Sequence, residues 1–395
     1  MSKEKRFNRL QIGLSTGSHF ITDVYQSIYI GLIPFFTVKF ELSLFQVSLM
    51  ASSSILANSL FSPLFGILSD RRGIRYYLAA GPLFTSIFLS VLGVLPNFYL
   101  IIIFLFLGNL SISAYHPASA AIAGHYGGRR KGTSSSIINF GGNLGNALGS
   151  FIIILILEKI GIQYTPLIMI PGIITALVLI RFAPRDNETQ RHQSTSFTLG
   201  KIENMNMAKL AMLCIILFMV YNLYIVWITV LNFMPLYYIE RNISLINIGS
   251  IILVFGALGG ASGLLSGYLY DHSKKGNIII QAALFISIPL FFFAFRTGGL
   301  LSIILFIAAG FFMISVQPVC IRIAQDLLPG NMALASSLVL GLSPGIAGIT
   351  MIFLGKLADS IGIVTLINYE LLGLVAAFLV FMLFPVMEKR SNQHL

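Results

Sequence analysis

Apolar segments of about 20 residues, the length an α-helix needs to cross the hydrocarbon core of a bilayer, recur along the whole chain. Short polar breaks separate them. Of the 395 residues, 56% are hydrophobic and only 10% are charged, which excludes a soluble domain with one ordinary core. We therefore expect an all-α membrane protein with twelve transmembrane helices. The expected spans are 10–38, 44–68, 76–95, 98–124, 133–157, 164–182, 208–237, 245–270, 277–296, 299–321, 332–355 and 364–386.

Lysine and arginine fall unevenly on the two sides of these spans. With the N-terminus in the cytoplasm, only five of the 25 basic residues lie on the opposite side: Lys39, Lys159, Arg241, Arg296 and Lys356. Because basic residues favour cytoplasmic loops, both termini are predicted to be cytoplasmic. The net charge of +11 is spread over separate short loops, so we expect no nucleic-acid partner.

The chain matches itself at a constant offset of 201 residues. The matched pairs include Pro34 with Pro235, Gly66 with Gly267, Asp70 with Asp271, and Pro117 with Pro318. This repeat predicts two six-helix halves in the same membrane orientation, an arrangement found in some secondary transporters. We expect one bundle over residues 1–184, a polar cytoplasmic linker over 185–207 and a second bundle over 208–395.

The segment GILSDRRGIR, residues 66–75, resembles the signature loop of the major facilitator superfamily. The positions that carry the resemblance are Gly66, Asp70, Arg71, Gly73 and Arg75. A weaker copy, GYLYDHSKKG, lies at the equivalent loop of the second half and contains Asp271. The resemblance implies the major facilitator fold and a cytoplasmic gate built from these residues. The alternative is an ordinary basic loop with no gating role.

The fifth span carries Gly141, Gly145 and Gly149 at every fourth position. Their spacing is similar to the antiporter motif of the superfamily, although Asn146 stands where that motif has proline. Glycines on one helix face also permit close helix crossing, which is an equally good explanation. Three segments resemble the fosmidomycin resistance family of efflux carriers: HFITD (19–23), AYHPASA (114–120) and this glycine-containing stretch of the fifth span. That resemblance implies export by a monomer.

Of the 14 acidic residues, only Asp23 and Glu370 fall well inside an expected span. Ionisable groups in hydrocarbon are costly and usually functional. His19 and Asp23 are four residues apart and share a helix face, and His116 is expected at a similar depth. In the superfamily the first and fourth spans line a central cavity, so the three could converge there. We predict that His19, Asp23 and His116 carry the coupling proton.

Purely structural roles remain open for His19 and Glu370. His19 could be only an interhelical hydrogen-bonding group. Glu370 lies near the outer end of the last span, where we expect it to reach the membrane interface.

The offset of 201 matches Asp23 with Tyr224 and His116 with Gln317. At these positions, only the first half has side chains that change protonation state near neutral pH. The predicted substrate-binding residues are therefore polar or aromatic groups of the second half: Tyr224, Gln317, Asn222 and Trp227. Asn143 in the fifth span contacts either a neighbouring helix or substrate. Arg322 either pairs with Asp326 four residues on or binds an anionic substrate.

These features predict a secondary active transporter that works by alternating access. The leading prediction is proton-coupled efflux, or antiport, of a small organic molecule or drug in a bacterial inner membrane. The alternatives are proton-coupled uptake of a small metabolite, such as an organic acid or sugar, and a lipid flippase on the same fold. The sequence lacks an HExxH pair, a phosphate-binding loop and a CxxC pattern, so we expect no enzyme, metal or cofactor. The expected partners are substrate, protons and the lipid bilayer.

Overall fold

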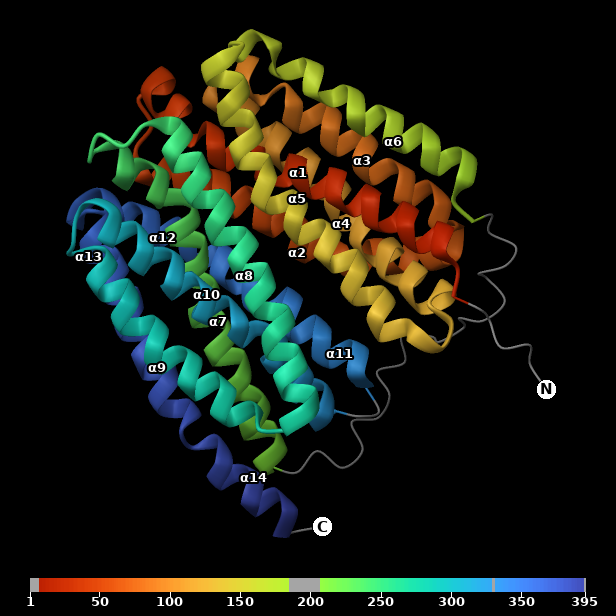
Figure 1. Cartoon of the computed structure of the whole chain (residues 1–395), viewed down its shortest axis with the longest axis vertical. Coiled ribbons are helices and arrows are strands. Elements are labelled where there is room, and N and C mark those ends of the chain that lie inside the picture. Colours follow the sequence, from red (N-terminus) through yellow and green to blue (C-terminus); the bar gives the residue numbers. More distant parts are fainter. Residues whose placement is uncertain (1–6, 185–206, 329–330, 394–395) are drawn as a thin grey trace. The chain divides into compact units, whose positions relative to one another are not determined.

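A computed structural model of the chain describes residues 7–184, 207–328 and 331–393 (Figure 1). Side chains are described throughout these ranges except at 70–72, 129, 131–132, 332–333 and 389–393. The described part is helical. Its α-helices are α1 (Arg9–Phe40), α2 (Leu44–Arg72), α3 (Ile74–Ser90), α4 (Phe98–Tyr126), α5 (Lys131–Lys159), α6 (Met169–Phe182), α7 (Met207–Ile239), α8 (Leu245–Ser273), α9 (Gly276–Ala294), α10 (Gly299–Leu327), α11 (Met332–Ser337), α12 (Ser343–Ile361), α13 (Ile363–Phe381) and α14 (Phe384–Gln393).

In the described ranges, 12 helical spans are long and apolar enough to cross a membrane, which confirms the expected number. The internal repeat is equally visible. Helix α8 begins and ends 201 residues after α2, and α10 does the same relative to α4. The chain is thus a twelve-span membrane protein whose two halves repeat the same helix order.

Polar side chains set several helix boundaries. Asn97 accepts the backbone N–H of Leu100 at 3.0 Å and begins α4. A capping box begins α2, where the Ser43 hydroxyl accepts the N–H of Gln46 and the Gln46 side chain accepts the N–H of Ser43. Each cap satisfies backbone donors that have no partner within the helix.

The starts of α1 and α3 lie beside the ends of α4 and α6. The backbone N–H of Asn8 donates to the Tyr126 carbonyl at 2.9 Å, and the Gln11 side chain donates to the Phe182 carbonyl at 3.0 Å. The guanidinium of Arg75 donates to the Ala183 carbonyl directly after α6. These bonds hold helices of alternating direction together at one end of the first half.

Helix α5 packs against α1 along a row of glycines. A Cβ atom at Gly141 would lie 2.6 Å from the Thr16 carbonyl oxygen, and Cβ atoms at Gly145 and Gly149 would collide with the carbonyls of Phe20 and Val24. Both rows advance by four residues. The backbones therefore approach closely along one continuous seam, as the glycine spacing predicted.

The eleventh span differs from the continuous helix expected over 332–355. It is divided into α11, a π-helical turn at Leu338–Leu342 and α12. Pro344 lies in the first turn of α12 and has no backbone N–H to donate to the preceding turn. The interrupted hydrogen-bond ladder gives a physical reason for the break.

The chain forms two compact units: Met1–Ser194 with Met234–Gly256, and Thr195–Phe233 with Ala257–Leu395. The bundles expected over 1–184 and 208–395 remain predictions. The expected linker, 185–207, lies outside the described residues except for Met207, the first residue of α7.

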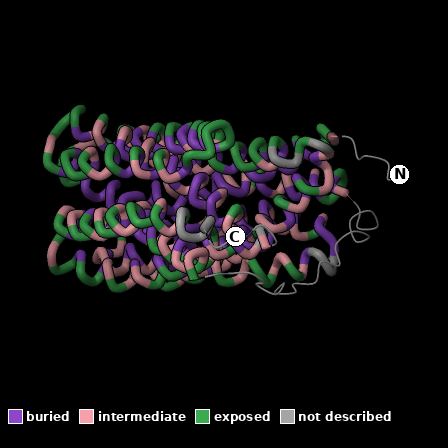
Figure 2. The backbone as a smooth tube through the Cα atoms, turned by 90° about the horizontal axis from the view of Figure 1, so that it is seen from below, coloured by how far each residue is buried: buried purple, intermediate pink, exposed green. Residues whose placement is uncertain are grey.

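Large apolar side chains cover the outer surfaces of the helices. Phe285 and Leu300 are each 71% exposed, and Phe353 is 69% exposed. Figure 2 shows buried segments on the sides of helices that face other helices, and exposed segments along the outer edges. A surface of this kind suits lipid, in which backbone polar groups must be satisfied inside each helix.

Candidate proton and substrate site

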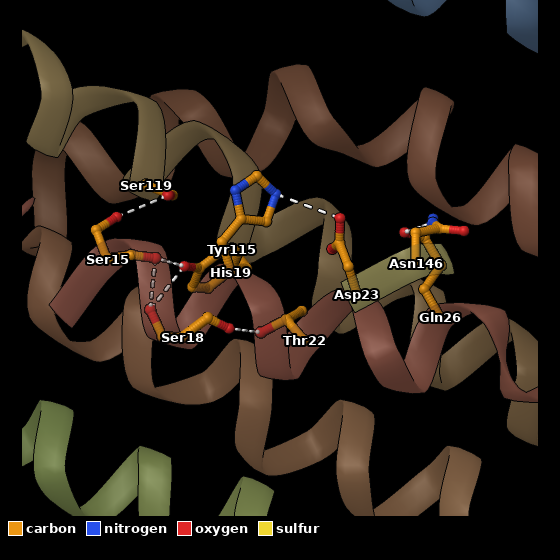
Figure 3. Close-up of polar contacts among 9 residues, drawn as sticks. All are labelled: Ser15, Ser18, His19, Thr22, Asp23, Gln26, Tyr115, Ser119 and Asn146. Carbon is orange, nitrogen blue, oxygen red and sulfur yellow. Dashed lines mark hydrogen bonds and ion pairs between the residues drawn. The ribbon is translucent and has the colours of Figure 1, made fainter. Parts of the chain in front are cut away.

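His19 and Asp23 form a buried pair on α1. The Nε2 atom of His19 lies 3.5 Å from Oδ2 of Asp23, and each residue is only 7% exposed (Figure 3). The separation of four residues places both side chains on the same helix face, as expected. The distance suits an ion pair when the imidazole is protonated.

His116 reaches the same place from α4. Its ring centroid lies 5.1 Å from that of His19, in an edge-on arrangement. One ligand-type atom from each of His19, Asp23 and His116 lies within 4.8 Å of the other two. The structure therefore brings the three predicted proton-carrying residues together.

A hydroxyl network that the sequence analysis missed supports this cluster. The Tyr115 hydroxyl donates to the Ser15 carbonyl at 3.0 Å and lies 2.7 Å from the Ser18 hydroxyl, while the Ser15 and Ser119 hydroxyls are 2.8 Å apart (Figure 3). The His19 ring packs against Tyr115 at 5.6 Å between centroids. The network ties α1 to α4 beside the histidine pair, and its α1 side chains come from the turn that precedes His19.

The sequence did contain a signal for this network. Ser15, His19, Asp23 and Gln26 recur every three or four residues and form a polar stripe along one face of the first span. Tyr115 stands directly before His116 in the AYHPASA segment.

Helix α5 covers the His19–Asp23 pair with a glycine. A Cβ atom at Gly142 would lie 2.6 Å from Nε2 of His19 and 2.7 Å from Oδ2 of Asp23. On the other side of each group, Nδ1 of His19 and Oδ1 of Asp23 are buried without a hydrogen-bond partner in the described protein. Buried polar atoms of this kind call for a partner, and a bound proton or a bound molecule can supply one here.

This arrangement can bind a proton and move it over a short distance. Two imidazoles and a carboxylate within 4.8 Å offer three alternative positions for it. The same donor set is also one that a divalent ion such as Zn²⁺ accepts. The expectation that no metal binds here remains a prediction.

In the second half, two of the predicted substrate-binding residues touch each other. The Gln317 side chain on α10 donates to the Tyr224 hydroxyl on α7 at 2.6 Å. Both residues are half-buried, and so is Trp227 on α7. They present polar and aromatic groups from two helices of the same unit.

The other predicted substrate contacts are more dispersed. The Asn222 amide donates to the Phe218 carbonyl of its own helix, and its Oδ1 lies 2.9 Å from where a Cβ of Gly373 would stand. Asn222 therefore packs against α13. Asn143 is exposed on α5.

The predicted gate residues of the first half are only partly described. The side chains of Asp70 and Arg71 lie outside the described part of the structure. Gly73 joins α2 to α3 at φ +102°, which strains any residue with a Cβ atom. Gly66 faces Pro117 of α4, but a Cβ there would lie 3.6 Å away in ordinary contact, so this neighbour does not require glycine.

Arg322 contacts a predicted gate residue of the second half. Its guanidinium lies 3.9 Å from the Asp271 carboxylate at the end of α8 and donates to the Gln325 side chain at 3.1 Å. Asp326, the alternative partner considered for Arg322, instead accepts the Tyr270 hydroxyl. Among the described residues, the salt bridge of Arg322 thus links α10 to α8 rather than one turn of α10 to the next.

The expectation that Glu370 reaches the membrane interface is wrong. Glu370 on α13 is 7% exposed, and its Oε1 accepts the Thr229 hydroxyl of α7 at 2.6 Å. Its position near the end of the helix suggested snorkelling, but the inward-facing side of α13 holds it against α7.

Comparison with known proteins agrees with this architecture. The family model of the Major Facilitator Superfamily matches residues 16–341. The chain is 25% identical to the fosmidomycin resistance protein of Escherichia coli K12, over 93% of this chain and 89% of that protein. It is 26% identical to the uncharacterised MFS-type transporter YfnC of Bacillus subtilis, over 87% and 85% of the two chains.

A solved structure shares the fold. It is a bacterial homologue of the human lysosomal transporter Spinster, in an inward-facing and occupied conformation, with a TM-score of 0.77 and 14% identity over 96% of this chain and 97% of that one. Twelve spans, a repeat of helix order and the family match over most of the sequence converge on one assignment. The chain belongs to the Major Facilitator Superfamily and is a membrane transporter rather than an enzyme.

Proposed function

We propose that this transporter is a proton-coupled antiporter that exports a small organic molecule or drug by alternating access. The observation that carries the proposal is the cluster of buried His19 and Asp23 with half-buried His116, in which two polar atoms have no partner in the described protein. A carboxylate and two imidazoles inside membrane spans are costly unless they serve transport.

The cluster couples transport to protons through its net charge. With neutral imidazoles and an ionised Asp23 it carries one negative charge, and one bound proton makes it neutral. A charge change of this kind is expensive in a low-dielectric interior, so the two states favour different surroundings. His116, with its ring 5.1 Å from that of His19, gives the proton a second position on a different helix.

Substrate recognition is assigned mainly to neutral groups of the second half. Tyr224 and Gln317 satisfy each other at 2.6 Å, and a substrate with its own donor and acceptor can replace that bond. Trp227 offers an aromatic face. Asn222 and Asn143 are supplementary candidates, because the first packs against α13 and the second is exposed on α5.

Gating is assigned to the loops at the ends of α2 and α8. The first comprises Gly66, Asp70, Arg71, Gly73 and Arg75, and the second contains Asp271. The contact with Asp271 supports a gating role for Arg322 in place of anion binding. In this proposal, residues 1–184 and 208–395 act as two bundles that rock about the linker at 185–207.

The direction of transport is inferred from a relative. The Escherichia coli protein is named for resistance to fosmidomycin, which favours export of a toxic compound. Bacterial relatives over most of the chain support a place in the inner membrane, and the basic loops support cytoplasmic termini. We propose a monomer. Uptake of a small metabolite and lipid flipping are the alternatives.

The test is transport in proteoliposomes with an imposed pH gradient and an internal pH dye. Fosmidomycin, organic acids and other drugs are added in turn to the wild type, Asp23→Asn and Asp359→Asn. The last variant removes an exposed carboxylate of α12 and serves as the matched control. We expect substrate-dependent proton movement in the wild type and the control and its loss in Asp23→Asn.

Other outcomes separate the alternatives. Substrate movement without proton flux would make the protein a uniporter or exchanger and would contradict the role of Asp23. Loss of wild-type activity on treatment with a metal chelator would instead favour a metal in the cluster. In cells, a deletion that abolishes resistance supports export, whereas a deletion that abolishes growth on one nutrient supports uptake.

A further inference from the structure

Glu370 is a second buried carboxyl group, and it lies in the other half of the chain. Among the acidic residues whose side chains the structure describes, only Asp23 and Glu370 are buried, each with 7% exposure. The transport scheme above uses Asp23 and leaves Glu370 without a role.

In the described part of the chain, Glu370 pairs with no cation. Thr229 of α7 bonds to Oε1 at 2.6 Å, and Met351 of α12 lies next to that hydroxyl, so both of these neighbours are neutral. On the α9 side, Arg296 donates to Asn368 of α13 at 3.0 Å. Among the described residues, no lysine, arginine or histidine forms a salt bridge with Glu370. An ionised carboxylate in this place would be uncompensated.

The Thr229 hydroxyl can share a hydrogen bond with Glu370 in both protonation states. Oγ1 of Thr229 lies 2.6 Å from Oε1 of Glu370 and 3.5 Å from Sδ of Met351. When Glu370 is ionised, the Thr229 hydroxyl donates to the carboxylate. When Glu370 holds a proton, its own O–H donates to Thr229, and the threonine hydrogen turns to the methionine sulfur. Oε2 is buried without a partner in the described protein, which leaves a second position for a proton.

The first half links the equivalent helices without an ionisable carboxyl. There the Tyr25 hydroxyl of α1 donates to the Ile168 carbonyl at 2.6 Å and accepts the backbone N–H of Gly172 at 3.0 Å. Gly172 corresponds to Gly373 of α13 at the 201-residue offset. A polar tie between these helices therefore does not need a carboxylate, so the acid in the second half calls for another explanation.

We propose that Glu370 is a second exchangeable proton site, so that each half of the transporter binds one proton. Binding of a proton forms an O–H bond on the Glu370 carboxylate, and release of the proton restores the anion. Thr229 is the hydrogen-bonding partner in both states. Its part in the transport cycle rests on the proton coupling proposed above, but proton binding at Glu370 can be measured without any substrate.

The first experiment follows the carboxylic-acid C=O band by infrared difference spectroscopy while the pH is changed. The full-length protein is placed in liposomes with its glutamate side-chain carboxyls labelled with ¹³C, which distinguishes glutamate from aspartate bands. We expect a label-sensitive band that appears on acidification in the wild type and in Glu240→Gln, which removes an exposed glutamate, and is lost in Glu370→Gln. Thr229→Val should shift the band and its midpoint pH. An unchanged band in Glu370→Gln, or no label-sensitive band in the wild type, would overturn the proposal.

The second experiment tests the role of this proton in transport. For the compound that gives the largest wild-type proton signal, the pH dependence of proton flux is compared in Glu370→Gln, which keeps the shape of the side chain, and in Tyr25→Phe. We expect a shifted pH profile only in the glutamine variant, and an unchanged profile would reduce Glu370 to a structural tie. If no compound moves protons in the wild type, the proton coupling proposed above fails, while the infrared titration still decides whether Glu370 binds a proton. If Glu370→Gln does not fold, the labelled wild type and Thr229→Val decide the first experiment.

Discussion

Replacement of Gly142 by alanine should damage the proton cluster far more than it damages the fold. The added Cβ would stand 2.6 Å from Nε2 of His19 and 2.7 Å from Oδ2 of Asp23, whereas ordinary contact begins at 3.4 Å. The two side-chain tips must therefore move by about 0.8 and 0.7 Å, respectively, since the α5 backbone is held by the glycine seam. Both members of the 3.5 Å pair are displaced at once.

The expected cost in stability is small. Overpacking of a tight site costs about 1–3 kcal/mol, while alanine gains about 1 kcal/mol over glycine within a helix. The net loss is about 0–2 kcal/mol. Gly17→Ala is the matched control, because a Cβ there meets no heavy atom within 4 Å. We expect that variant to be as stable as the wild type or slightly more so.

The assay combines thermal unfolding in detergent with proton-driven transport in proteoliposomes. Gly142→Ala should unfold within a few degrees of the wild type and lose most of its proton-coupled transport, while Gly17→Ala keeps both. Wild-type transport with an unchanged pH profile in Gly142→Ala would show that the geometry of the His19–Asp23 pair does not matter for coupling, and the reasoning would be refuted.

Two further substitutions test the second half. Arg322→Gln removes a salt bridge of 3.9 Å between side chains that are 41% and 61% exposed, so stability should change by less than about 1 kcal/mol while the transport rate falls; an unchanged rate would argue against gating. Tyr224→Phe removes the hydroxyl to which Gln317 donates. The loss of one hydrogen bond, worth about 1 kcal/mol, should change KM for substrate about fivefold. Proton coupling should not change. An unaltered KM would remove Tyr224 from the substrate site.

The span count and the repeat could be predicted because both depend on local composition. Lipid requires about 20 apolar residues per helix, and this requirement leaves a mark in the sequence. The meeting of His19, Asp23 and His116 could also be anticipated, because helical spacing and depth along a span place side chains to within about a turn. The row of glycines on α5 could be predicted for the same reason, because helical spacing places Gly141, Gly145 and Gly149 on one face.

The failures concern contacts across helices. Nothing in the local sequence of Glu370 reveals that Thr229, 141 residues earlier, turns it inward. The partner of Arg322 was sought one turn away, whereas the structure supplies Asp271 from another helix. The break at Leu338–Leu342 depends on how Pro344 enters the hydrogen-bond ladder, which hydropathy does not record.

The packing of α1 against α5 also restricts how many times the chain crosses the membrane between these two helices. Residue numbers rise together along this seam, since Gly141, Gly145 and Gly149 meet the carbonyls of Thr16, Phe20 and Val24 in the same order. The two helices are therefore parallel, and parallel spans in one chain must be separated by an odd number of crossings. Helices α2, α3 and α4 supply three. One missed or extra span between residues 41 and 130 would reverse α5 and destroy the match, so this contact checks the topology of the first half independently of hydropathy or charge.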